Sequence, residues 1–478
     1  MSTAWKPEDA INALMDRFAR RCVRIHRPFP PPCTRSGRSK LGGLPNLPPD
    51  IEWPYGRSRH RSSPTSTPLQ FLAQIDCSEL PRCGDLLPLS GMLYFFANTS
   101  DWGAWDGHQP DDFRRVLYAP RVGADQAVRR PPVDMPDVSC HKGVGGVYPR
   151  GYSFAHQPND PLTGKVYFEW PVQFVVTDSY PDADAVCKSP AWVGLAADWN
   201  ARAEADESFR DEYGDETVLL DMYSEARSER MLRALCAALN VAEPPRSVAQ
   251  DRAPKTWRRI GAGLAFPPTA AFASEISAAI DYFMDDQIAE AEHARGLGAS
   301  PQPLPDWTED VRIVKQEAAG WLQRVRALPA DHVLDAQMRE RFLAWLDELE
   351  DRNWARIPGH TPRIFNGVRY PFGKAMFQLA RLAASQDVIR SHFPDALFAH
   401  DLFSQGGAHY HHHQMLGWFG SSQQPQPMSE PLVHLLQLSY DDLPDFRFGD
   451  VGEMQFFMTE RDLKAKNFNR VQAQMQGG

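Results

Sequence analysis

One stretch of the sequence occurs twice, near opposite ends of the chain, and constrains the fold more than any other feature. PLQFLAQIDCSELP begins at Pro68 and PLVHLLQLSYDDLP begins at Pro431. GMLYFF and GEMQFF follow them at Gly91 and Gly452. The identical pairs include Pro68 with Pro431, Leu69 with Leu432, Leu72 with Leu435, Gln74 with Gln437, Leu80 with Leu443, and Pro81 with Pro444. Each copy has the pattern of a strand, a turn ending in Leu-Pro, and an aromatic strand after a glycine.

This repeat predicts how the two ends of the chain come together. An isolated pair of strands cannot bury its aromatic side chains, so the two copies are expected to pack against each other. The economical arrangement is one β-sheet core made of two similar halves related by a pseudo-twofold axis. We therefore expect an α+β protein in which an internal duplication builds the core.

The residues between the two copies change character along the chain. β-type segments such as KVYFEWPVQFVVT dominate as far as residue 189. Over 190–400, apolar residues recur at three and four positions, as in FASEISAAIDYFMDDQIAEAEHA. The sequence thus predicts a discontinuous β-rich core, 39–189 and 401–478, that is interrupted by an all-helical insertion.

The first 38 residues are predicted to form an amphipathic helix and a Pro-rich linker. The apolar residues at helical spacing are Ile11, Leu14, Met15, Phe18, Cys22 and Val23. RPFPPPC, from Arg27, then breaks regular structure because consecutive prolines donate no backbone hydrogen bonds. The segment that follows, SKLGGLPNLPPDIEWP from Ser39, reads as a rigid ribbon of glycines and prolines.

Composition narrows the class of protein. No stretch approaches the ~20 apolar residues of a membrane span. A net charge of −10 disfavours nucleic acid as a partner, and a basic N-terminal arm is the only hint of one. The 7 cysteines contain no CxxC pair, which fits free thiols in a reducing compartment. We expect a cytoplasmic protein whose partner is an unknown protein or small molecule.

The motifs resemble those of the YwqG-like family, a bacterial domain of unknown function. The resemblance rests on SKLGGLPNLPPDIEWP, PLQFLAQIDCSELP, GMLYFF, HHQMLGW and the closing LLQLSYDD and GDVGEMQFFM, over roughly 39–180 and 405–463. It implies an α+β fold and brings no catalytic residues to carry over. The chain departs from the family in its long helical block and in GWFGSSQQPQP, which begins at Gly417.

Two glutamines are the first candidate site residues. Side chains alternate along a strand, so Leu72 and Gln74 are expected on one face, as are Leu435 and Gln437. An unpaired buried amide costs ~1–3 kcal/mol, so each amide needs a partner. Either each glutamine ties down the ribbon or hairpin of its own half, or the two converge near the pseudo-axis and hold a ligand.

A histidine tract supplies the other candidates. GGAHYHHHQMLGW contains His409, His411 and His413, which could share zinc or nickel if the segment is a strand. No HExxH motif accompanies them. The family resemblance marks His413 and Gln414 rather than the whole tract. His413 is therefore read as a buried structural residue, a ligand contact or a metal ligand, and no cofactor is predicted.

These observations predict a binding or interaction protein and leave the reaction, if any, unknown. The expected cleft lies on the pseudo-symmetric core and is lined by Gln74, Gln437, His413, Gln414 and Trp53. One alternative is a metal-dependent enzyme that uses the 409–413 tract. A second is an accessory or immunity-type partner of a toxin, by analogy with how such domains are used.

Overall fold

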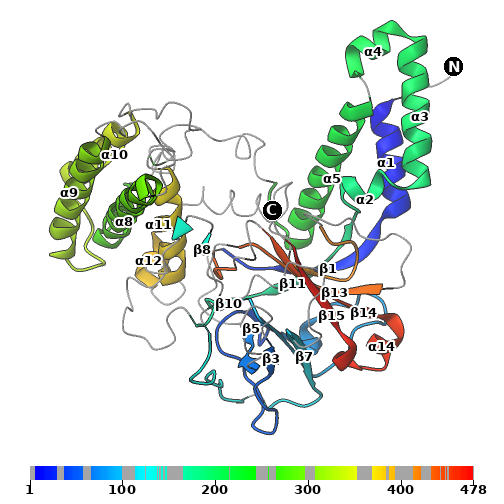
Figure 1. Ribbon diagram of the computed structural model, residues 1–478, viewed down its shortest axis with the longest axis horizontal. Helices are drawn as coiled ribbons and strands as arrows, with labels where there is room; N and C mark the ends of the chain where they lie inside the picture. The colour runs from blue at the N-terminus through cyan, green and yellow to red at the C-terminus, as the bar shows by residue number, and fades with distance from the viewer. Residues whose placement is uncertain are drawn as a thin grey trace.

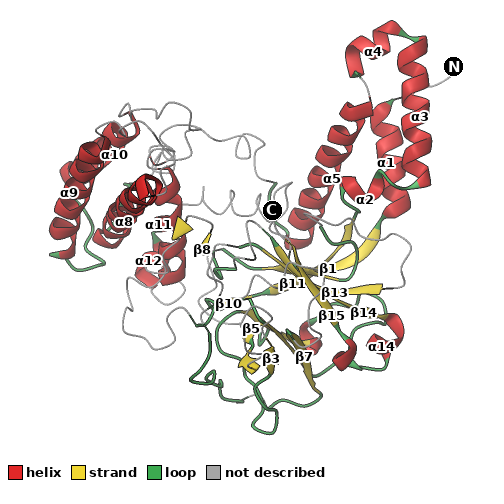
Figure 2. Cartoon of the chain, in the orientation of Figure 1, coloured by secondary structure: helices red, strands yellow, loops and turns green. Residues whose placement is uncertain are grey.

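The computed structural model describes the greater part of the chain. The described residues are 6–29, 37–57, 66–99, 113–123, 125–136, 138, 142–143, 146–147, 165–214, 216–243, 257, 265–296, 307–351, 369–383, 387–392, 413–420, 432–441, 443–446, 448 and 452–476. Figure 1 shows a β-rich core with a group of helices on either side, and Figure 2 shows the strands gathered in that core.

The core consists of two antiparallel sheets. The six-stranded sheet has the order β11-β1-β12-β13-β14-β15, and the five-stranded sheet has the order β10-β2-β5-β6-β7. The strands of the first are β11 (Gln173–Ser179), β1 (Arg20–His26), β12 (Gln414–Met415), β13 (Leu432–Ser439), β14 (Glu453–Thr459) and β15 (Gln472–Gln476). Those of the second are β10 (Trp170–Pro171), β2 (Lys40–Leu41), β5 (Gln70–Asp76), β6 (Met92–Ala97) and β7 (Arg114–Ala119). Two short hairpins lie outside these sheets, β3 (Tyr55–Arg57) with β4 (Ser66–Pro68), and β8 (Lys142–Gly143) with β9 (Gly146–Val147).

The two halves predicted from the repeat are present, and their details agree. The repeated strands form the hairpins β5-β6 and β13-β14, and each first strand carries a register shift at the same place, Leu72 in one copy and Leu435 in the other. The backbone N–H of Cys77 donates to Gly91 O at 2.8 Å, and that of Tyr440 donates to Gly452 O at 2.8 Å. The duplication is therefore confirmed at the level of single hydrogen bonds.

A further pair of corresponding segments escaped the sequence comparison. Lys40–Gly43 and Gln414–Gly417 pair with β5 and β13 in the same register, and both contain consecutive positive φ angles. These are 58° and 71° at Gly42 and Gly43, and 62° and 72° at Leu416 and Gly417. With these segments included, the five strands β10-β2-β5-β6-β7 correspond one by one to β1-β12-β13-β14-β15. The strand β11 is an addition to the second half.

The two sheets pack face to face around one apolar core. Its centre includes Phe95 and Phe456, corresponding residues of the two halves, whose rings lie edge to face at 5.3 Å. Contact between equivalent residues is what a pseudo-twofold axis through the core requires. The fold class predicted from the sequence, α+β with a twinned sheet core and a helical interruption, is confirmed.

The register shifts correct one expectation about side-chain direction. Leu72 and Leu435 were expected on the faces of Gln74 and Gln437, but both leucines lie in the core between the sheets. An extra residue at each shift reverses the alternation, so the leucine turns inward while the glutamine stays outside.

The helices form two groups. The first comprises α1 (Pro7–Phe18), α2 (Ala183–Val186), α3 (Pro190–Ala205), α4 (Glu207–Tyr213) and α5 (Glu216–Leu239), and α5 packs against β11. The second comprises α8 (Ala270–Gly296), α9 (Trp307–Arg326), α10 (Ala336–Asp351), α11 (Arg369–Ala383) and α12 (Asp387–Ser391). Short helices α14 (Glu460–Lys464), η1 (Cys77–Glu79) and η4 (Phe468–Arg470) complete the described elements.

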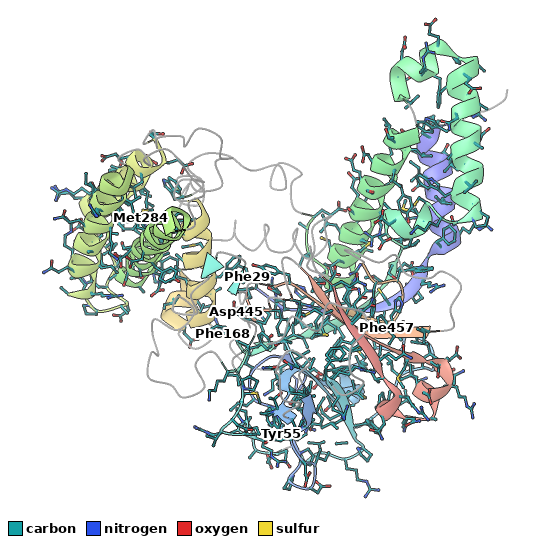
Figure 3. All side chains as sticks on the ribbon, viewed as in Figure 1. Phe29, Tyr55, Phe168, Met284, Asp445 and Phe457 are labelled. Atoms are coloured by element: carbon teal, nitrogen blue, oxygen red, sulfur yellow. The ribbon has the colours of Figure 1, made fainter. Side chains whose placement is uncertain are left out.

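The second helical group contacts the β core through a small apolar surface. Trp170 and Leu443 lie in the same buried cluster as the cores of these helices, and Phe29 packs against it. Figure 3 shows Phe29, Phe168 and Asp445 on the side of the core that faces these helices. No helix among the described residues is long and apolar enough to cross a membrane.

The N-terminal helix is shorter than its periodicity predicts. It ends at Phe18, and the next residues form β1, where Cys22 and Val23 lie in a strand. β1 runs between β11 and β12, so pairing on both edges overrides the helical spacing of its apolar residues.

Candidate functional site

Gln74 and Trp53 lie on the outer face of the five-stranded sheet, away from the other half. The Gln74 amide donates to Arg38 O at 2.7 Å and to Asn46 Oδ1 at 3.0 Å, and it accepts from Asn46 N at 2.9 Å. The Trp53 indole donates to Leu69 O at 3.0 Å. Gln74 thus holds the Gly/Pro ribbon of its own half, which is the structural alternative that the sequence offered.

Gln437 and Gln414 lie on the outer face of the other sheet. They belong to one row of polar residues across five strands, each paired with the next: Arg24, Gln414, Gln437, Gln455 and Gln474. Gln437 Nε2 donates to Ser439 Oγ at 3.0 Å, and Gln455 Nε2 donates to Gln437 Oε1 at 3.3 Å. Gln74 and Gln437 are therefore on opposite outer faces of the core and do not share a cavity.

The row is buried although it faces away from the core. The segment Leu416–Gly420 crosses it, held by the Gln414 amide, which donates to Leu416 O and Trp418 O. A Cβ on Gly420 would lie 3.6 Å from Glu453 Oε1 and 3.8 Å from Gln437 Nε2, so this residue lies directly over the row. A sheet face covered in this way normally carries apolar side chains, and here it carries amides and charges.

Arg24 is the most unusual member of this face. Its side chain is 5% exposed, and its Nη1 has no hydrogen-bond partner. Among the described residues no carboxylate lies within ion-pair distance of it. Burial lowers the pKa of Arg24 from its ordinary value; Cys22, two residues earlier on the same strand, opposes this shift, and the positive charge of Arg227 on α5 adds to it. A buried guanidinium beside a second guanidinium is a strongly electropositive environment.

Arg227 reaches the same region from the helix. Its Nε donates to Tyr180 O at 3.1 Å, and burial lowers its pKa as well. The carboxyl groups of Asp182 and Glu453 are near enough to oppose that shift. The two arginines come from elements far apart in the sequence, and the sheet and α5 bring them together.

Glu453 completes the cluster from β14. The residue is 4% exposed, and its Oε2 has no hydrogen-bond partner among the described residues. Burial raises the pKa of Glu453 to about 8, with a further contribution from Asp182 and an opposing one from Arg227. The group is therefore a neutral carboxylic acid at pH 7, able to donate one hydrogen bond as well as accept. Arg24, Arg227 and Glu453 together form what we call the buried polar cluster.

His413 belongs to a different arrangement, at the end of the second half that meets the helices. Its Nδ1 accepts from Ser439 N at 3.1 Å, which places the proton on Nε2, 3.0 Å from Asp441 Oδ2. Arg27 also donates to Asp441, and all three side chains are at most 3% exposed. In the first half, Ser39 Oγ accepts from Asp76 N at 2.8 Å at the corresponding place. His413 thus connects the ribbon of its half to β13, as Ser39 does in the first half.

Metal binding by the histidine tract stays a prediction. His409 and His411 lie outside the described residues, and only His413 is placed. Within the described part of the chain, no group of three His, Cys, Asp or Glu side chains could hold a metal ion.

The sequence did not identify Arg24, Arg227 or Glu453 as site residues. Arg24 was hidden in a segment read as a helix, where a charged residue is expected on the solvent side. In RRCVRIH a strand reading places Arg24 on the face opposite Val23 and Ile25, which was the available signal. Arg227 and Glu453 carry no such signal because their proximity depends on packing between elements.

Comparison with known families gives one match. The family described as a domain of unknown function (DUF1963) matches residues 39–249 and 323–477. DUF1963 is related to the YwqG-like family that the motifs resemble. The match extends beyond the 39–180 and 405–463 covered by that resemblance, and it omits 250–322, which contains α8. No curated protein matches the chain.

Proposed function

The chain belongs to the DUF1963 family, and we propose that it is a binding protein for a small anionic ligand, held by Arg24 and Arg227 on the outer face of the six-stranded sheet. The ligand class is a carboxylate or phosphate, because a guanidinium presents paired N–H donors that match two oxygens of either group. The proposal keeps the binding function expected from the sequence and moves the site to the second half alone.

The observation that carries this proposal is the environment of Arg24. Removing an ion from water without a partner costs several kcal/mol, so buried arginines are normally paired with a carboxylate. Arg24 is buried, has an unpartnered Nη1 and has Arg227 as its charged neighbour. An anion bound between the two guanidiniums would supply the missing charge and hydrogen bonds.

The rest of the buried polar cluster favours an oxyanion that also offers a hydrogen-bond acceptor. Glu453 is protonated at neutral pH because of its raised pKa, so its O–H can donate a hydrogen bond to a ligand oxygen. Gln414, Gln437 and Gln455 fix the covering segment and the neighbouring strand through their amides. The cluster is therefore held in place before a ligand arrives, which reduces the ordering cost of binding.

Calorimetric titration with inorganic phosphate and with succinate tests the proposal. We expect the wild-type protein to bind one of these anions, and Arg24→Leu to weaken the affinity about tenfold or more, since one charged hydrogen-bonding group is lost. Arg21→Leu is the matched control. It removes an arginine from the same strand, but one whose side chain is 63% exposed. Equal affinities in the wild type and Arg24→Leu, or no binding of either anion, would overturn the proposal.

A second experiment is designed to identify the natural ligand. Small molecules released when the purified protein is denatured are identified by mass spectrometry and compared between the wild type and Arg24→Leu. An anion present in the first sample and depleted in the second is the expected result. The metal-dependent enzyme, the toxin partner and the cytoplasmic location all stay predictions of the sequence.

A further inference from the structure

The two halves carry a buried cation at the same cross-strand pair. Lys40 pairs with Pro171 across β2 and β10, and Gln414 pairs with Arg24 across β12 and β1. These pairs correspond to each other in the duplicated sheets. The cation is on the inner strand of the pair in the first half and on the edge-side strand in the second. Lys40 is 4% exposed and Arg24 is 5% exposed.

The surroundings of the two cations differ in a way that predicts different ligands. Lys40 Nζ lies 2.9 Å from Glu169 Oε2, and the Glu169 side chain is 23% exposed. This ion pair lies in the wall of a cleft of about 140 Å³, lined by Gly37, Arg38, Ser39, Lys40, Asn46, Glu169 and Pro171. At ~30 Å³ per water molecule, a cleft of this volume holds on the order of five of them, which is the size range of a small amino acid.

The wall of the cleft is built to keep its shape. The Gln74 side chain accepts a hydrogen bond from the backbone N–H of Asn46. It also donates to Asn46 Oδ1 and to Arg38 O. Gly43 leaves the space that Glu169 occupies, because a Cβ there would lie 2.4 Å from Glu169 Oε2. Gly43 also has a φ of 71°, which other residues rarely adopt. Gln74, singled out from the sequence, is thus a positioning residue for this cleft.

The chemistry of the ion pair selects a ligand that carries both charges. A Lys ammonium has three N–H donors, and a carboxylate offers about four lone-pair sites, so each can serve more than one partner. A ligand carboxylate beside Lys40 and a ligand ammonium beside Glu169 would form a four-charge arrangement with alternating signs. A ligand with a single charge would complement only one of Lys40 and Glu169. The other would lie beside a like charge or an uncharged group of the ligand.

We propose that the cleft beside Lys40 and Glu169 is a second binding site, which takes a small zwitterion of the α-amino acid class. It is separate from the buried polar cluster, because the two lie on opposite outer faces of the core. The duplicated fold therefore has one ligand site in each half, with an anion in the second and a zwitterion in the first.

Binding of L-alanine to the full-length protein, measured by equilibrium dialysis with radiolabelled alanine, tests this site. Acetate and methylamine, each with one of the two charges, are the competitors. We expect alanine to bind, and both Glu169→Gln and Lys40→Met to weaken its affinity about tenfold or more. Neither acetate nor methylamine should displace alanine at an equal concentration. Lys165→Met is the matched control, since its ammonium donates to Val133 O at an exposed position outside the cleft.

The outcomes separate this proposal from the previous one. Arg24→Leu should retain full alanine binding, and Glu169→Gln should retain full binding of phosphate or succinate. If Lys40→Met fails to fold, Glu169→Gln decides alone, because that side chain is 23% exposed and glutamine keeps its shape. Unchanged alanine affinity in a folded Glu169→Gln protein, or displacement of alanine by acetate alone, would overturn the zwitterion site.

Discussion

Replacing Glu453 by glutamine should remove a large part of the pH dependence of stability. The folded protein keeps the Glu453 proton up to a pKa of about 8, whereas the unfolded chain releases it near the ordinary value of 4.5. The raised pKa therefore stabilises the protein fully below pH 4.5, and this contribution is lost as the pH rises toward 8. The slope is about 1.4 kcal/mol per pH unit, and the upper limit over the whole range is about 5 kcal/mol. Glutamine has the same shape as the neutral acid and does not ionise, so it lacks this slope.

Urea unfolding at two pH values measures the effect. Between about pH 5.5 and pH 7.5, the wild type should lose about 3 kcal/mol more unfolding free energy than Glu453→Gln, since other titrating groups cancel in the comparison. Glu52→Gln, at an exposed position, is the control and should follow the wild type. Parallel curves for the wild type and Glu453→Gln would refute the reasoning, because Glu453 would then ionise normally inside the folded protein.

Three further substitutions test other parts of the structure. Asp441→Asn should cost about 3–5 kcal/mol of unfolding free energy in urea, because the buried guanidinium of Arg27 loses the carboxylate that it contacts; a loss below about 1 kcal/mol would contradict that. Gly452→Ala should lower the melting temperature, because a Cβ would lie 1.8 Å from Gln476 O, while Gly123→Ala, with no atom within 4 Å, should leave it unchanged. Arg24→Leu should raise the stability of ligand-free protein by about 1–4 kcal/mol in urea unfolding, and a decrease would mean that the guanidinium has a structural partner.

The architecture was predictable because the repeat consists of residues that are typical of strands and turns. Gln74 and Gln437, with the Leu-Pro turns after them, mark equivalent positions that the backbone reproduces hydrogen bond by hydrogen bond. The ribbon of the second half was harder to find. KLGG and QMLG share only one glycine in register. The positive φ of Leu416 could not be predicted, because leucine rarely adopts such an angle.

The side-chain directions were less predictable than the strands. A single extra residue at Leu72 or Leu435 reverses the faces of its strand, and no sequence signal marks it because leucine suits either face. The helix predicted through Val23 failed for a related reason. Apolar spacing in a short segment fits a helix or a strand. Here pairing with β11 and β12, which come from distant parts of the chain, stabilises the strand.

The duplication makes the site residues interpretable in a way that a single domain would not. Corresponding cross-strand pairs have the same backbone geometry, so a difference between them reflects the needs of one half rather than the needs of the fold. Proline at Pro171 shows that the fold does not require a charge where Arg24 stands, and glutamine at Gln414 shows the same for Lys40. Each half nevertheless keeps one buried cation at this pair, on alternate strands, at a cost in desolvation that packing does not explain. Glu169 supplies the opposite charge for Lys40, and the anion that we propose would supply it for Arg24.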